Sequence, residues 1–112
     1  MTLPSYSSLP LVMMLSLSPS GTAIQSLRES VINNSPKDFT RDGYHMDLGA
    51  GRYALACTWY EKLIRPYTRR SMMGNTLRLD LGDVKVDDQT APYLQKAARQ
   101  AVKRPFKVRA VK

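Results

Sequence analysis

Five consecutive residues, Arg41-Asp42-Gly43-Tyr44-His45, hold the side chains of this sequence best suited to acid–base chemistry. Asp42 and His45 are three residues apart in a stretch rich in glycine and aspartate, which predicts a loop. In a turn, a carboxylate at this distance can accept a hydrogen bond from the imidazole Nδ1–H, which leaves Nε2 as a general base. Gly43 would allow the necessary sharp bend. The spacing alone is weak evidence, because many ordinary turns carry an exposed histidine at the same distance from an aspartate.

Other kinds of chemistry are restricted by composition. The chain has 112 residues, with one cysteine and one histidine. A single cysteine excludes an internal disulfide and a multi-cysteine metal cluster, and a single histidine excludes two-His and three-His metal sites. The aspartates of the segment 80–88 do not follow the spacing of a calcium-binding EF-hand loop. No apolar stretch reaches the roughly 18 residues that a membrane-spanning helix needs.

The net charge is +8, and the basic residues are concentrated at the C-terminal end. Seven Lys and Arg residues, and no acid, lie between Lys96 and Lys112. Such an end could attract nucleic acid or anionic lipid. We favour a solvated helix face followed by a tail, because no aromatic residue interrupts Lys96–Arg104 and Phe106 alone is no stacking platform. Nucleic acid is therefore not the expected partner, and a small basic module for nucleic acid or an acidic partner stays the alternative function.

The first twenty residues, Met1–Ser20, differ in composition from the rest because they contain no charge, six serines and three prolines. A signal peptide is one interpretation, since small residues at Gly21–Ala23 suit cleavage, but no Lys or Arg precedes Arg28. A buried strand is equally consistent with the short apolar run. We expect residues 1–20 to be a disordered or aberrant segment and residues 21–112 to be the domain. The sequence does not determine the compartment or the oligomeric state.

Apolar spacing predicts helices over Thr22–Val31, Arg52–Ile64 and Gln89–Lys103. The second is the strongest, with Glu61 on its solvent side and Pro66 closing it. The residues that we expect on the buried faces are, in chain order, Ile24, Leu27, Val31, Tyr53, Ala56, Cys57, Tyr60, Leu63, Ile64, Leu94, Ala97, Ala98, Ala101 and Val102.

The strand signals are short and leave the helices without enough cover. Leu77–Leu81 and Val84–Val86 alternate, and Gly82-Asp83 between them permits a hairpin or a loop. Phe106–Val111 also alternates and could form a terminal strand. The apolar helix faces are typical of helices that cover a sheet, and this chain supplies little of one.

Several separated segments resemble, in order, the C-terminal block of the SGNH/GDSL hydrolases. Gly21–Gln25 resembles a Gly-Thr-Ala-Ile-Gln segment found in a bacterial branch of uncharacterised function within that clan, and Thr40–His45 resembles its Thr-Arg-Asp-Gly-x-His loop. Gly51-Arg52-Tyr53 and the following ALACTWYEKL resemble the next helix, and Ala97–Phe106 resembles the closing helix. The resemblance covers about Gly21 to Val108.

The resemblance implies an α/β fold: this chain would be the C-terminal portion of a flavodoxin-like, three-layer SGNH hydrolase, helix-rich and with few short strands. It implies hydrolysis of a small-molecule or carbohydrate ester, often an acetyl ester, by a serine near the N-terminus of the family domain. His45 would take the proton of that serine, and Asp42 would orient His45. No metal or organic cofactor is implied.

The nucleophile block of that family, Gly-Asp-Ser or Gly-Asn-Ser after the first strand, is missing from this sequence. No residue before Thr40 matches the glycine and asparagine that donate to the oxyanion, and Gly74-Asn75-Thr76 lies after His45, in the wrong order. We therefore expect a remnant or truncated ester hydrolase that is inactive alone. A chain that supplies its Asp–His loop to a separately encoded partner with the serine is a further hypothesis.

Overall fold

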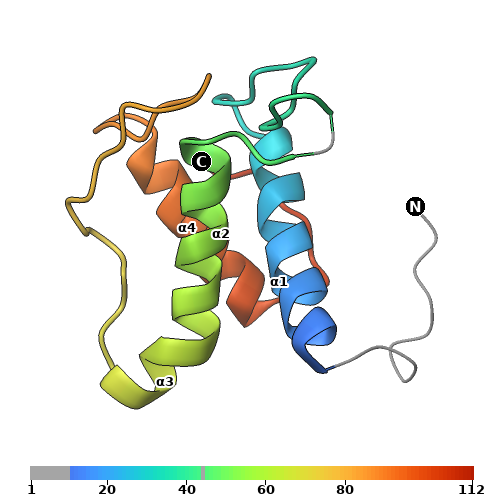
Figure 1. The fold of residues 1–112 in the computed structure, drawn as a ribbon. Coiled ribbons are helices and arrows are strands. Elements are labelled where there is room, and N and C mark those ends of the chain that lie inside the picture. The colour runs from blue at the N-terminus through green and yellow to red at the C-terminus, as the bar shows by residue number, and fades with distance from the viewer. Residues whose placement is uncertain (1–10, 44) are drawn as a thin grey trace.

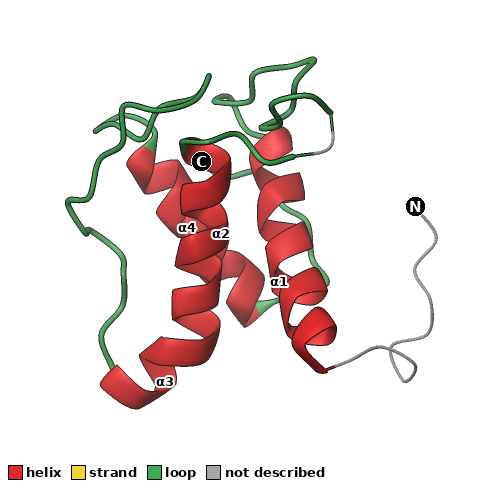
Figure 2. Ribbon diagram, in the orientation of Figure 1, coloured by secondary structure: helices red, strands yellow, loops and turns green. Residues whose placement is uncertain are grey.

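Three helices packed against one another form the core of the chain. The computed structural model describes residues 11–43 and 45–112. In it α1 (Leu11–Arg28), α2 (Ala50–Trp59) and α4 (Ala91–Lys103) contact each other pairwise (Figure 1). The last turn of α2 continues into a π-helical segment, η2 (Tyr60–Ile64), and then into the short helix α3 (Arg65–Thr68). Loops make up the rest of the described chain (Figure 2).

The few short strands expected of this chain are not found, since the described residues contain no strand. Two isolated antiparallel bridges occur, Thr40 with Met46 and Leu79 with Val86. Of the hairpin or loop that the sequence permits over 77–86, the structure has a loop with one bridged residue pair, whose two backbone hydrogen bonds are each 3.0 Å long. The fold is helix-rich, and its flavodoxin-like character is not confirmed.

Residues 106–112 form no strand, and two of their amide groups donate instead to side chains on α1 and just after its end. The N–H of Arg109 donates to Ser26 Oγ at 3.0 Å, and the N–H of Val111 donates to Ser30 Oγ at 2.8 Å. Val111 is buried in the core. The C-terminal segment therefore lies along α1, which the alternating pattern of Phe106–Val111 did not predict.

The first helix is longer at its start than its apolar spacing predicts. It begins at Leu11 rather than at Thr22, runs through Pro19 and ends at Arg28. Ala23, Ile24 and Leu27 are buried, whereas Val31, expected on the same face, lies beyond the helix end and is 84% exposed. The helix thus includes residues 11–20, which the sequence analysis assigns to a separate segment, and Met1–Pro10 lie outside the described residues. Within 11–43 and 45–112 no helix has both the length and the apolar character that crossing a bilayer requires.

The predicted helix over Arg52–Ile64 is present, but its buried face changes direction part-way. Tyr53 and Cys57 are buried as expected, while Ile64 is 48% exposed and Glu61, expected in water, is 2% exposed. The cause is η2, because a π-helical turn holds more residues than an α-helical turn and rotates the following side chains. Pro66 does not end the helix, because it lies in the first turn of α3, where a missing N–H costs little.

The prediction for the last helix is largely confirmed. α4 spans Ala91–Lys103, and its small residues lie inside the helix cluster. Small side chains let α4 approach α1 and α2 closely. The residues of the predicted stripe that are buried are Leu94, Ala97, Ala98 and Ala101.

Candidate functional site

Phe39 anchors the loop that carries Asp42 and His45. Its side chain is fully buried, although its backbone has the positive φ of 64° that is uncommon outside glycine. The N–H of Phe39 donates to Asn34 Oδ1, and its carbonyl accepts from the N–H of Asp47, both at 2.8 Å. The bridge between Thr40 and Met46 then closes the loop. Asp42 and His45 are therefore presented on a short loop whose two ends are fixed to the core.

Asp42 and His45 contact each other twice within this loop. Asp42 Oδ2 is 2.7 Å from His45 Nδ1, and Asp42 Oδ1 accepts the backbone N–H of His45 at 2.8 Å. Gly43 has a φ of 92°, as its expected role in the bend requires, and its N–H donates to Thr40 Oγ1 at 2.9 Å. The carbonyl of His45 accepts the N–H of Arg41 at 2.8 Å. The turn thus brings together the two side chains that the spacing singled out.

This contact selects one form of the imidazole ring. A carboxylate can only accept, so the ring nitrogen facing Asp42 Oδ2 carries the hydrogen and the lone pair of neutral His45 lies on Nε2. The His45 side chain is 65% exposed and that of Asp42 is 51% exposed. An incoming hydroxyl group can therefore reach Nε2 from solvent or from a partner surface.

Among the residues that the structure describes, no other part of a catalytic apparatus is assembled around the ring. No hydroxyl side chain of residues 11–43 or 45–112 is hydrogen-bonded to the imidazole of His45. The described part of the chain also has no group of three or more His, Cys, Asp and Glu side chains that could hold a metal ion. What the loop can do chemically is accept and return a proton.

Asp47, which the sequence analysis did not single out, is the buried residue that fixes the C-terminal end of this loop. It is 1% exposed and gathers backbone amides from two segments of the chain. Its Oδ2 accepts the N–H of Gly49 at 3.1 Å and of Gly51 at 3.4 Å, and its Oδ1 accepts the N–H of Asp83 at 2.7 Å and of Val84 at 3.4 Å. An aspartate two residues before a glycine at a helix start is the only signal that could have pointed to it.

A surface ion pair joins Asp83 to a third segment, the one that precedes Phe39. Lys37 Nζ donates to Asp83 Oδ2 at 2.8 Å. The pKa of Lys37 is raised above its ordinary value, mainly by the hydrogen bond to this carboxylate and to a smaller extent by the negative charge of the carboxylate. Both side chains are half exposed, so the pair adds little to stability on its own.

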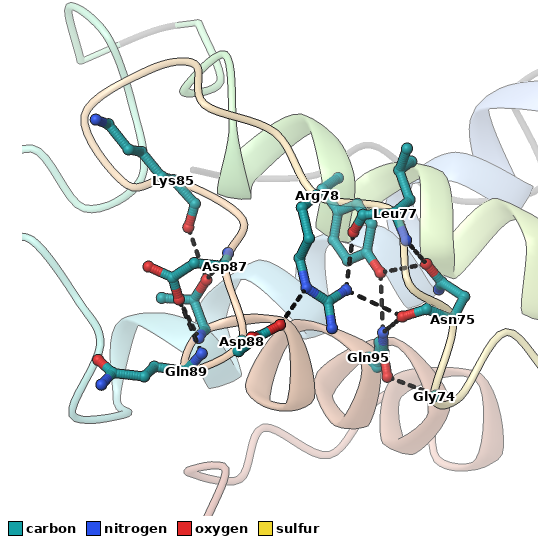
Figure 3. A network of polar contacts seen from close by, with 11 residues as sticks. Gly74, Asn75, Leu77, Arg78, Lys85, Asp87, Asp88, Gln89 and Gln95 are labelled. Carbon is teal, nitrogen blue, oxygen red and sulfur yellow. Dashed lines mark hydrogen bonds and ion pairs between the residues drawn. The ribbon is translucent and has the colours of Figure 1, made fainter.

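A polar network away from His45 joins α2, α4 and the segment 72–90 (Figure 3). Gln95, buried on α4, accepts the N–H of Gly74 at 2.7 Å and donates to Tyr53 Oη at 3.0 Å. Tyr53 in turn donates to Asn75 Oδ1 at 3.1 Å. Burial raises the pKa of the Tyr53 hydroxyl, which the hydrogen bond from Gln95 partly offsets. The polar groups of Gln95, Tyr53 and Asn75 are hydrogen-bonded to one another. The network therefore positions the segment 72–90, and we assign it no catalytic role.

Glu61 and Cys57 are two further buried groups to which we assign a structural role. Glu61 Oε1 accepts Ser71 Oγ at 2.8 Å and the N–H of Met72 at 3.2 Å, and its Oε2 lies 3.3 Å from Arg65 Nη1. Burial raises the pKa of the Cys57 thiol to about 12, so the reactive thiolate is scarce at neutral pH. Neither group extends the site at His45.

The comparisons with known proteins identify the family of the chain. Residues 5–100 match the family model described as Domain of unknown function (DUF4886). The chain belongs to this family. No curated protein matches the sequence, and no solved structure matches it. The match includes both Asp42 and His45, and the description of the DUF4886 family assigns no chemistry to either residue.

Proposed function

We propose that this DUF4886 chain supplies the general base and its orienting carboxylate to an ester hydrolase of the SGNH/GDSL type. The contact of 2.7 Å between His45 Nδ1 and Asp42 Oδ2 carries the proposal, together with the second contact that fixes Asp42 to the backbone of His45. The sequence resemblance supports the reaction class. The substrate is a small-molecule or carbohydrate ester, with acetyl esters favoured.

In this proposal the serine comes from a segment that carries the Gly-Asp-Ser or Gly-Asn-Ser pattern and that this sequence does not contain. The serine hydroxyl attacks the acyl carbon, and His45 Nε2 takes its proton. The protonated ring then gives that proton to the departing alkoxide. Water that His45 deprotonates next attacks the acyl-serine, and the ring returns this proton to the departing serine oxygen as the acid is released. Asp42 keeps Nδ1 protonated and stabilises the charged ring.

The exposure of the dyad fits this division of labour. A general base buried within its own chain could not reach a nucleophile on a separate chain, whereas the His45 side chain is 65% exposed. The bent loop is nevertheless fixed at Phe39 and Asp47, so the ring is presented on a defined support. A pre-positioned base contributes about 10²–10⁴-fold to the rate of such a reaction.

The test is hydrolysis of p-nitrophenyl acetate by the purified chain, alone and mixed with the product of the nearest reading frame that encodes the serine pattern. The chain alone is expected to be no faster than the same concentration of free imidazole. The mixture is expected to turn over the ester, and His45→Ala and Asp42→Ala are each expected to lower its rate by about 10²–10⁴-fold. Asp88→Ala is the matched control, because its exposed carboxylate lies far along the chain.

Two results would contradict the proposal. Turnover by the chain alone that disappears in His45→Ala would show that the chain holds its own nucleophile. Activity of the mixture that survives His45→Ala would show that the base lies elsewhere.

A further inference from the structure

A basic pocket lies where α4 ends and the C-terminal segment turns back along α1. It has a volume of about 380 Å³. Four of its five lining residues carry a positive charge, and these are Lys103, Arg104, Lys107 and Arg109, with Gln100 as the fifth. A second hollow of about 260 Å³ adjoins it, shares Gln100 and Lys103 with it, and adds Lys96 and Arg99. We call the two together the basic face.

The pocket is built by the fold rather than by neighbours in sequence alone. Lys103 closes α4, whereas Lys107 and Arg109 belong to the segment that the Ser26 and Ser30 hydroxyls hold against α1. The hydroxyl of Thr22 on α1 also donates to the carbonyl of Pro105. These contacts hold the C-terminal segment against α1, so that basic side chains from the end of α4 and from this segment line the same pocket.

Ion pairs with acidic residues of the described chain do not explain why four basic residues lie around the pocket. In the described part of the chain no ion pair includes any of the four basic residues of the pocket. Lys103 and Arg104 complement the negative end of the α4 dipole, which explains two of them. Lys107 and Arg109 lie beyond the helix and have no such explanation. Four unpaired like charges around one hollow repel each other and favour an anion between them.

An exposed aromatic side chain indicates which anion. Phe106 lies between Arg104 and Lys107 in sequence and is 79% exposed. The carboxylates of an acidic peptide gain nothing from such a ring, whereas an unpaired nucleobase stacks on it while basic side chains hold the adjoining phosphates. The two hollows adjoin, since they share lining residues, so the face offers more than one place for a phosphate. We propose that the basic face binds single-stranded nucleic acid, with phosphates at the basic pocket and a base stacked on Phe106.

The proposal does not depend on Asp42 and His45. It departs from the solvated face expected from the sequence and from the expectation that Phe106 offers no stacking platform, because the ring is exposed and its neighbours in sequence line a basic pocket. Helical periodicity predicts only that Lys96, Arg99 and Lys103 lie on one face of α4. The return of the chain along α1, which adds Lys107 and Arg109, is visible only in the structure.

The test is fluorescence anisotropy of a labelled oligothymidylate titrated with the full chain at several salt concentrations. The pocket variant changes all four basic pocket residues to Gln. A control variant removes the same four charges from exposed positions elsewhere, namely Arg41, Arg52, Lys62 and Arg70. The pocket variant is expected to bind at least about tenfold more weakly than the control and to lose about 3 from the slope of log K against log salt. Phe106→Ala is expected to weaken binding by about 5- to 150-fold.

Three results would overturn the proposal. Equal losses in the pocket and control variants would show that net charge alone attracts the strand. Equal affinity for a polyglutamate peptide of the same charge, unaffected by Phe106→Ala, would show a surface for acidic protein. Absence of binding at low salt by a chain with the circular dichroism of a folded helical protein would exclude the site altogether.

Discussion

Asp47 Oδ1 accepts the backbone N–H of Asp83 at 2.7 Å, across a separation of 36 residues. Through this bond the start of α2 is joined to the turn at 82–84. The same turn is held from the other side by Lys37, which lies just before the buried Phe39. The support of the Asp42–His45 loop is therefore a set of contacts between distant segments.

Replacing Asp47 by alanine is expected to lower the free energy of unfolding by about 2–4 kcal/mol. Four backbone amides would lose their acceptor, and buried donors without partners are costly. Chemical denaturation followed by circular dichroism measures the change. Asp88→Ala is the control, since its side chain is 94% exposed and it pairs only at the surface with Arg78, so a change below about 1 kcal/mol is expected. Similar losses for both variants would show that Asp47 is not the support described.

Two glycines should respond in opposite directions to alanine. A Cβ at Gly49 would overlap the carbonyl oxygen of Leu81 and lie 2.6 Å from that of Val84, and these backbone atoms cannot move aside cheaply. Gly49→Ala is therefore expected to destabilise the fold by more than about 2 kcal/mol. Gly21, inside α1 and exposed, has nothing within 4 Å of such a Cβ. Gly21→Ala is expected to stabilise by about 0.5–1 kcal/mol. Thermal melts of both variants check the signs, and a stabilised Gly49→Ala would contradict the close approach.

Loss of the Gln95 side chain should loosen the contact between α4 and the segment 72–90. Gln95→Ala leaves the N–H of Gly74 and the hydroxyl of Tyr53 without one of their partners, with an expected cost of about 1–3 kcal/mol. Gln100→Ala, on the same helix and exposed, is expected to change stability by less than about 0.5 kcal/mol. Amide hydrogen exchange would add a local readout, because the N–H of Gly74 should exchange faster only in Gln95→Ala. Unchanged protection of Gly74 would rule out the network shown in Figure 3.

Alkaline pH should destabilise the fold partly through Cys57. Burial raises the pKa of its thiol from 9.0 to about 12, so the folded state keeps a proton that the unfolded state loses above pH 9. The stabilisation is complete below pH 9 and is lost as the pH rises toward 12, by up to about 1.4 kcal/mol per pH unit. Cys57→Ala should flatten this part of the curve of unfolding free energy against pH, whatever its effect at pH 7. Parallel curves for the two proteins would show that the thiol is not buried as described.

The parts of the fold that follow local rules could be predicted from the sequence. Leu94, Ala97 and Ala101 recur at helical spacing and are buried, and a glycine between Asp42 and His45 allows the tight turn that joins them. Spacing and turn chemistry act over a few residues, so they are readable without the rest of the chain.

The features that depend on distant segments could not be predicted. Glu61 turns inward because η2 changes the helix register. Its carboxylate there accepts hydrogen bonds from the hydroxyl of Ser71 and the N–H of Met72. The segment after Pro105 is extended against Ser26 and Ser30 rather than paired as a strand. In each case the deciding partner is ten or more residues away, and nothing in the local pattern names it.

The tautomer of His45 tests the central claim most directly. Long-range ¹H–¹⁵N correlation spectra of the labelled protein, recorded at a pH where the ring is neutral, distinguish protonated from unprotonated ring nitrogens. Since this chain has one histidine, the assignment needs no further label. We predict a hydrogen on Nδ1 and a lone pair on Nε2, and a shift toward the Nε2–H form in Asp42→Ala but not in Asp88→Ala. A wild-type ring with its hydrogen on Nε2, unchanged by Asp42→Ala, would contradict the account.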